Sequence, residues 1–346
     1  MAHIGGKCRL RIPREVKKAI SAWDIGRILT CNRARRGVVN RNFMLRTPHG
    51  KYVLRQVSHT HHKTPRDLEF ELDYLDYLKH AGFPYDIPSA VATKNDGFFV
   101  TGQGHYYWLY KFLEGVVLER LNEPHLAQLA EMMASYHKLL ERSALNNGKP
   151  ASDLYNRAAT LKEIEENRKE ILQKTKVDRN ANIFLEESAK LIQILRGLDE
   201  GLYSRLRFYP IHRDLNPENL IWKEDKLVGV IDFENASGSN DPVVKDIAVT
   251  MQYCCRSKKV KHQLDIDLAK GFLQSYKKHR SLSDQEVRLI PYLLTAGFVE
   301  DFAYAFWMLR NDPKRANPYR LTLYSRAAEW SYLNRERIAR ALMNER

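Results

Sequence analysis

The chain has 346 residues, with 56 Lys and Arg against 42 Asp and Glu, which gives a formal net charge of +14. Hydrophobic residues make up 44% and charged residues 28%, a balance that is typical of folded proteins and excludes a disordered chain. No apolar run approaches the roughly 18–20 residues that span a bilayer, and residues 1–20 lack the apolar core of a secretory signal, so we expect no transmembrane segment.

The spacing of the cysteines indicates the cellular compartment in which the protein is expected to work. Cys8, Cys31, Cys254 and Cys255 form neither a Cys-x-x-Cys pair nor an evenly spaced framework. The simplest interpretation is reduced thiols in a cytoplasmic protein. The length allows about two domains of ordinary size.

The positive charge is concentrated at one end of the chain. Residues 1–66 hold 16 Lys and Arg and 2 acids, which is +14, so the remaining 280 residues carry 40 charges of each sign. This asymmetry indicates a polyanion near residues 1–66: a nucleic acid, an anionic membrane surface or a nucleotide phosphate chain. A solvated basic face is the alternative. No base-stacking aromatic pattern accompanies the arginines, so we expect no specific nucleic acid partner.

The first third of the chain predicts a small sheet with one long helix. Thr64-Pro65 begins that helix, leucines recur at helical spacing from Leu68 to Leu78, and Gly82 ends it. Turn residues at 47–50 and 94–97 predict two hairpins. The predicted elements are a helix at 13–20 and strands at 28–30, 43–45, 52–54, 90–93, 98–100 and 106–113.

Helices predominate after residue 113. The boundary falls near residues 113–115, so we expect a mixed lobe over 1–113, which includes a basic extension over 1–21, and a helical lobe over 114–346. The fold class is therefore α+β. The predicted elements of the second lobe are helices at 126–140, 161–172, 184–198, 266–276, 294–309 and 320–342, and strands at 220–222 and 227–231.

The densest chemical signal lies in Ile211–Leu220 and Val230–Glu234. Asp232 ends an apolar strand, and Asn219 lies in a neighbouring polar loop. Carboxylate and amide oxygens are ligands that Mg²⁺ accepts together with phosphate and water. The second carboxylate of the loop, Asp214, would remain free to orient and deprotonate an attacking hydroxyl.

The pattern His212-x-Asp214-x4-Asn219 with Ile-Asp232-Phe downstream resembles the kinase-like phosphotransferases: aminoglycoside phosphotransferases, choline kinases and the homoserine kinases of that fold. The resemblance implies a bilobal protein-kinase-like fold, with a small N-terminal antiparallel sheet lobe that carries one helix and a larger, mainly helical C-terminal lobe. It implies that Asp214 is the catalytic base, that Asn219 and Asp232 bind magnesium, and that His212 supports the loop. Asp246 resembles the family's later loop-tethering aspartate, although a plain helix N-terminal acid is an equal alternative.

Two departures from the small-molecule pattern point in different directions. Arg213 replaces the usual glycine, which favours the protein kinases. Asp232-Phe-Glu234, however, lacks the glycine of their Asp-Phe-Gly, and no Ala-Pro-Glu sequence follows it.

The first lobe carries a similar resemblance at its predicted nucleotide loop. The stretch 36–43 contains Gly37, Asn40 and Asn42 and resembles the Gly-x-x-Asn-x-Asn-Tyr pattern of homoserine-kinase-like members. Its backbone N–H groups and basic side chains are expected to cover the phosphates. Arg36, Arg41 and Arg55 are the best candidates for the basic residues beside ATP, which leaves the excess in residues 1–18 for a second anionic partner.

The resemblance assigns three further nucleotide contacts. Arg55 occupies the place of the phosphate-pairing lysine, and Glu71 is its expected ion-pair partner, with Glu69 as the alternative. Lys111 and Phe112 lie where the adenine-binding hinge is expected.

The predicted reaction moves the γ-phosphoryl group of ATP, with Mg²⁺, to a hydroxyl of a small metabolite. Homoserine-like acceptors are nearest to the pattern, with amino alcohols or sugars as close alternatives and a protein acceptor, as in a protein kinase, as a weaker one. Glu300, Asp301 or Tyr304 would line the acceptor pocket if they are not core residues. The other class of function is a non-catalytic or regulatory kinase-fold module that binds an anionic partner.

Overall fold

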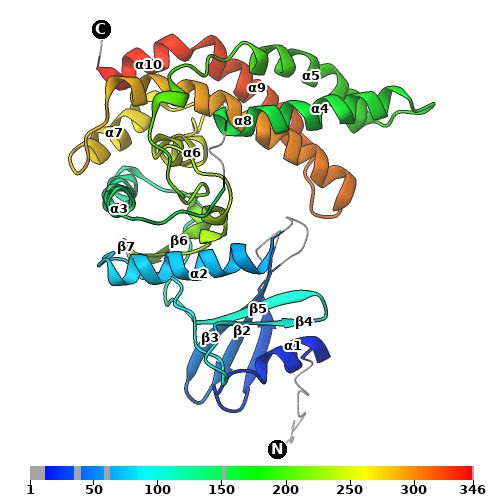
Figure 1. Cartoon of the computed structure of the whole chain (residues 1–346). Coiled ribbons are helices and arrows are strands. Elements are labelled where there is room, and N and C mark those ends of the chain that lie inside the picture. Colours follow the sequence, from blue (N-terminus) through cyan, green and yellow to red (C-terminus); the bar gives the residue numbers. More distant parts are fainter. Residues whose placement is uncertain (1–11, 35–39, 58–62, 150–152, 345–346) are drawn as a thin grey trace, which may run out of the picture. The chain divides into compact units, whose positions relative to one another are not determined.

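The computed structural model describes residues 12–34, 40–57, 63–149 and 153–344 (Figure 1). The chain forms two compact units. Unit 1 comprises Met1–Gly115 and Val228–Ile231, and unit 2 comprises Val116–Leu227 and Asp232–Arg346. The expected α+β, protein-kinase-like class is confirmed, because an antiparallel sheet occupies the N-terminal part and helices form most of the remainder.

Unit 1 is built on a five-stranded sheet in the order β1-β2-β3-β5-β4 (Figure 1). All the neighbouring strands in this sheet run antiparallel. The predicted hairpin at residues 47–50 is formed, with Thr47 opposite Gly50 across a two-residue turn. The strands are β1 (Thr30–Arg33), β2 (Arg41–Thr47), β3 (Gly50–Val57), β4 (Phe99–Gly102) and β5 (His105–Lys111).

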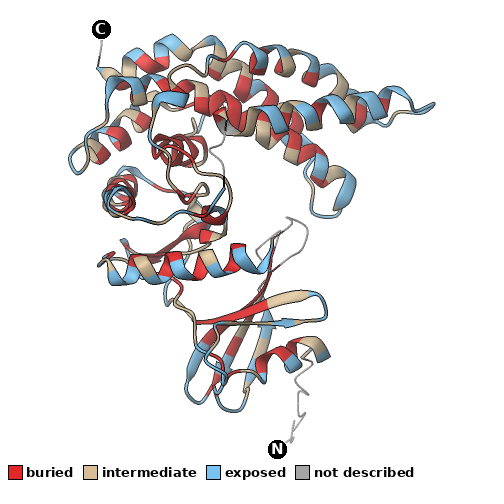
Figure 2. Cartoon of the chain, viewed as in Figure 1, coloured by how far each residue is buried: buried red, intermediate tan, exposed pale blue. Residues whose placement is uncertain are grey.

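One face of this sheet is covered by α1 (Arg14–Ile20), the helix predicted at 13–20. Val16, Ala19 and Ile20 of α1 join a buried cluster with Phe43, Leu45, Tyr52, Leu54, Tyr107 and Leu109 of the sheet (Figure 2). Because side chains alternate along a strand, the residues between these point to the opposite face. Arg55 is therefore placed on the other face of β3.

The long predicted helix is α2 (Pro65–His80). Thr64 and Asp67 form a reciprocal capping box at its start, and Gly82, with a φ of 80°, follows its end. The leucine stripe from Leu68 to Leu78 is buried.

The predicted hairpin between 90–93 and 98–100 is wrong. Ala90 makes a single bridge to Tyr110, whereas β4 pairs with β5. The turn of that hairpin lies at Gln103 and Gly104, which both have positive φ values, 49° and 75°. Such a pair suits the twist of a tight hairpin, so the polar turn at 94–97 closes only a local loop.

Unit 2 is mainly helical. The strands β6 (Leu220–Lys223) and β7 (Lys226–Val230) pair as a two-stranded sheet, in which residues 228–230 of β7 belong to unit 1. Most predicted helices are present, and α6 begins beside Asp246, which the sequence placed at a helix start; the helix predicted at 320–342 is divided at Asn334. The helices are α3 (Glu123–Glu141), α4 (Arg157–Leu172), α5 (Arg179–Arg196), α6 (Val244–Cys254), α7 (Ile266–Lys277), α8 (Asp284–Asn311), α9 (Tyr319–Leu333) and α10 (Arg335–Met343).

The helix α8 forms the centre of unit 2. It packs against α6 and α9, and Phe302 and Phe306 stack on Phe184 of α5. Although α8 is long and apolar enough to span a membrane, which the sequence expectation did not anticipate, 78% of its most apolar window is buried inside the protein. This burial is what the core helix of a folded unit shows.

Candidate active site

The residues of the sequence motif gather at a short 3-10 turn, Pro217–Asn219, in unit 2. Asn219 donates from Nδ2 to both the backbone oxygen and Oδ2 of Asp214, at 2.8 Å each. Asn216 donates from Nδ2 to Oδ1 of Asp214 at 2.6 Å. Both oxygens of the Asp214 carboxylate are therefore held by amides, which fixes the orientation of the group.

A second carboxylate, Asp232, lies close enough to act on Asp214. Burial and the charge of Asp232 raise the pKa of Asp214 from 3.8 to about 8, against the opposing hydrogen bonds from Asn216 and Asn219. Asp232 has a φ of 70°, so its backbone leaves β7 in the left-handed region. A cation bound between two carboxylates would reduce the repulsion between their charges.

The donor set fits a divalent metal with oxygen ligands. Among the residues that the structure describes, Asn219 makes its two side-chain hydrogen bonds through Nδ2, and Oδ1 has no hydrogen-bond partner. Within the described ranges no cluster of three or more His, Cys, Asp or Glu is present. Magnesium commonly takes one or two carboxylates from a protein and the rest of its ligands from phosphate and water.

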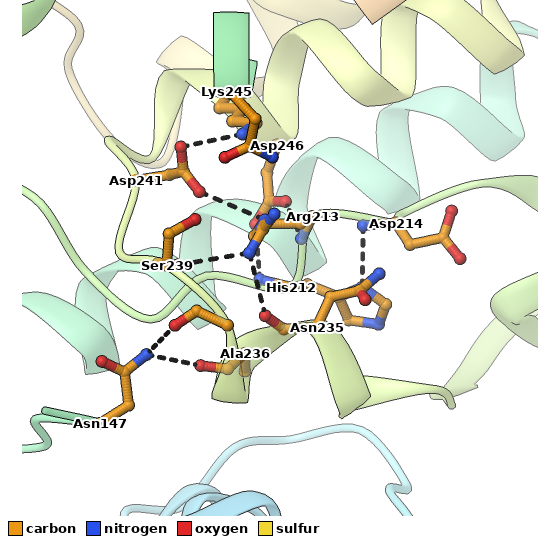
Figure 3. A network of polar contacts seen from close by, with 12 residues as sticks. Asn147, His212, Arg213, Asp214, Asn235, Ala236, Ser239, Asp241, Lys245 and Asp246 are labelled. Atoms are coloured by element: carbon orange, nitrogen blue, oxygen red, sulfur yellow. Dashed lines mark hydrogen bonds and ion pairs between the residues drawn. The ribbon is translucent and has the colours of Figure 1, made fainter. Parts of the chain in front are cut away.

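Asp246, at the start of α6, anchors the backbone of the motif loop (Figure 3). Its carboxylate accepts the backbone N–H of Arg213 at 2.6 Å and that of His212 at 3.2 Å. His137 Nε2 lies 3.2 Å from Asp246, and its Nδ1 lies 2.7 Å from the hydroxyl of Tyr276. The loop is thus tied to α3 and α7.

The partners of His137 determine its state. Burial lowers the pKa of His137 despite the opposing influence of Asp246. A neutral ring that donates from Nε2 to the carboxylate and accepts from the Tyr276 hydroxyl at Nδ1 satisfies both contacts. His212 is also buried; its Nδ1 accepts the Asp214 N–H at 3.3 Å and its ring packs 4.7 Å from that of Phe233.

Arg213 takes part in a charged network that the sequence did not reveal (Figure 3). Its backbone φ is 65°, and its Nε lies 3.2 Å from the carboxylate of Asp241. Buried Asp241 also receives the Nζ of Lys245 at 2.9 Å and the hydroxyl of Tyr203 at 2.6 Å. Asp241 precedes α6 and Lys245 lies in its first turn, and no sequence motif links them.

The three predicted acceptor residues of α8 have different surroundings. Asp301 accepts from Gln252 Nε2 at 2.7 Å and from the Tyr253 hydroxyl at 2.8 Å, and burial raises its pKa to about 6, so both of its oxygens have partners inside the unit. Tyr304 stacks on Trp307 with a ring separation of 5.8 Å. Glu300 lines a cavity with Arg213, Asn235 and Lys245.

The predicted nucleotide residues of unit 1 lie on and around its sheet. Arg55 of β3 is only 4% exposed, and Asn42 of β2 is its partner in the strand register. Oδ1 of Asn42 is buried and has no hydrogen-bond partner among the described residues, so an oxygen acceptor faces the interior beside a guanidinium. Asn40 is buried, whereas Gly37 and Arg36 lie outside the described residues.

The two candidate partners of Arg55 differ in their exposure to solvent. Glu71 is 1% exposed and Glu69 is exposed, so Glu71 fits the interior position better. Glu71 also forms an ion pair of 3.7 Å with Lys63, which the sequence interpretation missed. Lys63 directly precedes the cap of α2, and a basic residue at a helix start gave no signal on its own.

The predicted hinge follows β5. Lys111 is exposed, and the backbone N–H of Phe112 donates to Lys51 O at 3.0 Å. Lys51 also lies 5.6 Å above the ring of Phe112 and pairs with Glu114 at 2.9 Å. The hinge is thereby attached to β3.

Comparison with known proteins places the chain in a family. The model of the phosphotransferase enzyme family named APH matches residues 30–284. A homoserine kinase of Sinorhizobium fredii (strain NBRC 101917 / NGR234) is 29% identical, over 81% of this chain and 79% of that protein. A homoserine kinase of Rhodospirillum rubrum is 28% identical, over 79% of each.

Solved structures show the same fold at lower identity. The amicoumacin kinase hAmiN, in complex with AMP-PNP, Ca²⁺ and Ami, is 15% identical with a TM-score of 0.65 and 92% coverage of both chains. An aminoglycoside phosphotransferase of Alicyclobacillus acidocaldarius is 16% identical with a TM-score of 0.61 and 98% coverage of both. Because the family model spans well over half of the chain, this protein belongs to the APH phosphotransferase enzyme family and is a phosphotransferase.

Proposed function

We propose that this phosphotransferase moves the γ-phosphoryl group of ATP to the hydroxyl of a small metabolite in a magnesium-dependent reaction. The supporting observation is the orientation of Asp214, whose two oxygens are held by Asn216 and Asn219 next to a second carboxylate, Asp232. A fixed carboxylate can align a hydroxyl and accept its proton, which is the main task of a side chain in phosphoryl transfer.

The motif residues of unit 2 and Asp246 each receive a role in this proposal. Asp214 orients the acceptor hydroxyl and takes its proton. Asn219, through Oδ1, and Asp232 would hold Mg²⁺, which would neutralise phosphate charge when bound. His212 and Asp246 are positioning residues, because they hold the loop backbone that carries Asp214.

Unit 1 supplies the nucleotide contacts. We assign nucleotide binding to residues 1–113 and catalysis with acceptor binding to residues 114–346. Arg55 contacts phosphate, and Glu71 orients it inside the unit. The loop that contains Gly37, Asn40 and Asn42 covers the phosphates, and the backbone at Lys111 and Phe112 meets the adenine.

The acceptor is proposed from the relatives. Those cited above are homoserine kinases, which favours a homoserine-like acceptor over the amino alcohols and sugars. A metabolite kinase of this type would work in the cytoplasm, where ATP and small hydroxyl compounds are available.

The test is a turnover screen with the full chain, ATP and MgCl₂, in which ADP release and phosphorylated product are both measured across hydroxyl metabolites. Asp214→Ala should lower kcat by about 10²–10⁴-fold while ATP still raises the melting temperature. Asp232→Ala should instead weaken the stabilisation by Mg-ATP. Glu218→Gln, an exposed acid of the same turn, is the matched control. Nucleotide binding without turnover on any acceptor would favour the non-catalytic alternative.

A further inference from the structure

Two residues at the end of α6 each carry a buried polar atom that the fold leaves unmatched. Gln252 is fully buried, and its Oε1 has no hydrogen-bond partner among the described residues. Arg256 lies four residues later, and its buried Nη2 is in the same state. One of these atoms is an acceptor, and the other is a donor that carries part of a positive charge. Buried polar groups are nearly always paired, and an unmatched charged donor is the costlier exception.

The guanidinium of Arg256 is held in place from three sides. Its Nε donates to the backbone oxygen of Gln252 at 2.9 Å. Its Cζ lies 5.0 Å from the ring centre of Phe298 on α8 and 5.4 Å from that of Tyr324 on α9. Aromatic faces attract a cation but do not replace a carboxylate partner. Because Arg256 forms no ion pair within the described ranges, it presents a fixed positive charge to an anion.

Asp301 of α8 belongs to the same cluster, but its oxygens are already used. Oδ2 accepts from Nε2 of Gln252 at 2.7 Å, and Oδ1 accepts from the hydroxyl of Tyr253 at 2.8 Å. Burial raises the pKa of Asp301 to about 6, and the Tyr253 hydrogen bond and the charge of Arg256 oppose this rise. An ionised carboxylate only accepts hydrogen bonds, so Asp301 fixes the Gln252 amide with Nε2 towards itself and Oε1 away from it.

Helix α6 connects this cluster to the catalytic loop. Asp246 and Thr250, one turn apart, bond to the loop backbone on either side of Asp214, at 2.6 Å and 3.0 Å. Tyr253 lies about one further turn along α6 and contacts Asp301. Residues three and four positions apart share one face of a helix. The face of α6 that holds the catalytic loop therefore continues to the cluster around Asp301.

Tyr304 provides the corresponding link on α8. It lies three residues after Asp301, on the same face of the helix. Burial raises the pKa of Tyr304, the charges of Arg315 and Arg320 lower it, and those of Asp301 and Asp214 add to the effect of burial. Interactions between partly exposed charges fade beyond about 8–10 Å at physiological ionic strength. The α8 face that carries Asp301 and Tyr304 is therefore the face that approaches Asp214.

We propose that Arg256 and Gln252 bind the phosphoryl acceptor at its end remote from the reacting hydroxyl. Nη2 of Arg256 donates to an acidic group of the acceptor, and Oε1 of Gln252 accepts from a neighbouring N–H or O–H group. The proposal rests on the proposed function and assigns acceptor selection to two residues that no sequence motif contains. Asp301 is a positioning residue, because its hydrogen bond fixes the Gln252 amide.

The test of Arg256 uses three acceptors: homoserine, 3-aminopropan-1-ol without the carboxylate, and γ-hydroxybutyrate without the ammonium. Arg256→Met should lower kcat/KM for homoserine and for γ-hydroxybutyrate by about 10- to 100-fold, because both lose a hydrogen bond between charged groups. It should leave 3-aminopropan-1-ol turnover and the KM for ATP unchanged. Equal losses on all three acceptors would show a merely structural role and overturn the assignment.

A second variant keeps this test decisive if Arg256→Met does not fold. Arg256→Lys retains the charge without the planar fork of donors, so it should lose less on the two acids and nothing on 3-aminopropan-1-ol. Equal losses on all three acceptors would again count against Arg256. Arg335→Met is the matched control, because Arg335 also lies over an aromatic ring, 4.5 Å from the centre of Tyr332, and donates to a backbone oxygen at 2.8 Å, but at the start of α10. It should change no acceptor.

The role of Gln252 is tested with the same compounds. Gln252→Met removes the Oε1 acceptor, so kcat/KM for homoserine should fall by about tenfold. γ-Hydroxybutyrate has no ammonium group to donate and should be used as before. Asp301 loses a donor in this variant whichever acceptor is present, so a structural effect would lower both rates equally. That outcome would refute the part assigned to Gln252.

Binding of α-aminobutyrate separates this proposal from the proposed function, because the compound has both charged groups but no hydroxyl to phosphorylate. Calorimetry should show binding to the wild-type chain and at least about tenfold weaker binding to Arg256→Met. If this difference is found but no hydroxyl compound is phosphorylated, the proposed function fails and the Arg256 site stands. Equal affinity of the two proteins, or no binding to either, would overturn the Arg256 assignment even where homoserine is phosphorylated.

Discussion

The burial of Asp214 near the charge of Asp232 predicts that the Asp214 carboxylate destabilises the metal-free protein. The pKa of Asp214 is raised from 3.8 to about 8 by burial and by the charge of Asp232. A carboxyl whose pKa is higher in the folded state contributes its full stability below pH 3.8 and loses it as the pH rises towards 8. Replacing Asp214 by asparagine removes the titrating group and with it this loss.

The size of the effect follows from the shift. With these two pKa values, linkage gives a penalty of about 4 kcal/mol at pH 7 and of roughly 2 kcal/mol at pH 5. Asparagine keeps one acceptor oxygen for the donors from Asn216 and Asn219 and loses the other, at a cost of about 1 kcal/mol at every pH. The pH dependence of the difference, rather than its value at one pH, therefore identifies the cause.

The assay is urea or thermal unfolding of wild type and Asp214→Asn between pH 5 and pH 8, without metal or nucleotide. The stability of the variant relative to the wild type should grow by about 2–3 kcal/mol from pH 5 to pH 7, which corresponds to about 3–4 °C in melting temperature for a chain of this length. Glu218→Gln should give a constant difference over the same range. A constant difference for Asp214→Asn as well would refute the electrostatic reasoning, whatever the variant's loss of turnover.

Three further predictions concern other parts of the chain. Arg55→Lys should retain turnover with a rise in the KM for ATP of up to about tenfold, whereas Arg55→Met should lose most activity, as steady-state kinetics will measure. His137→Leu should cost about 1.5–3 kcal/mol in urea unfolding, because Asp246 loses a donor. It should also lose less stability than wild type as the pH falls through about 6.5, since burial lowers the pKa of His137. Gly229→Ala should lower the melting temperature by the equivalent of about 1–3 kcal/mol, because its β-carbon would lie 2.8 Å from a backbone oxygen, whereas Gly271→Ala in open space should not.

The parts of the site that the sequence revealed are close together along the chain. His212, Asp214 and Asn219 lie within eight consecutive residues, so a short turn brings them together whatever the remainder of the fold does. The capping box of Thr64 and Asp67 is similarly local. Motifs whose residues lie within a few positions of one another depend on a backbone geometry that the neighbouring residues largely determine.

The parts that the sequence could not reveal depend on distant residues. The support of Asp246 by His137 joins positions 109 residues apart, and the second contact of His137, with Tyr276, joins positions 139 apart. A buried histidine in an amphipathic helix looks like any other polar residue at a core position. The strand predicted at 90–93 failed for a different reason, because two local turns compete there and β4 pairs with β5 across Gln103 and Gly104 instead.

The distribution of charge also shows that the sequence alone does not reveal which distant residues come together. The count places the whole +14 in residues 1–66, yet within that segment Arg55 is buried while Arg41 is exposed, so the net charge does not describe one common surface. The remaining 280 residues are neutral, and they contain Arg213, Lys245 and Glu300 around one cavity. Neutrality there arises in part from opposite charges that folding brings together around one cavity. Net charge predicts attraction at long range, whereas recognition of a small charged ligand depends on which charges remain unpaired at short range.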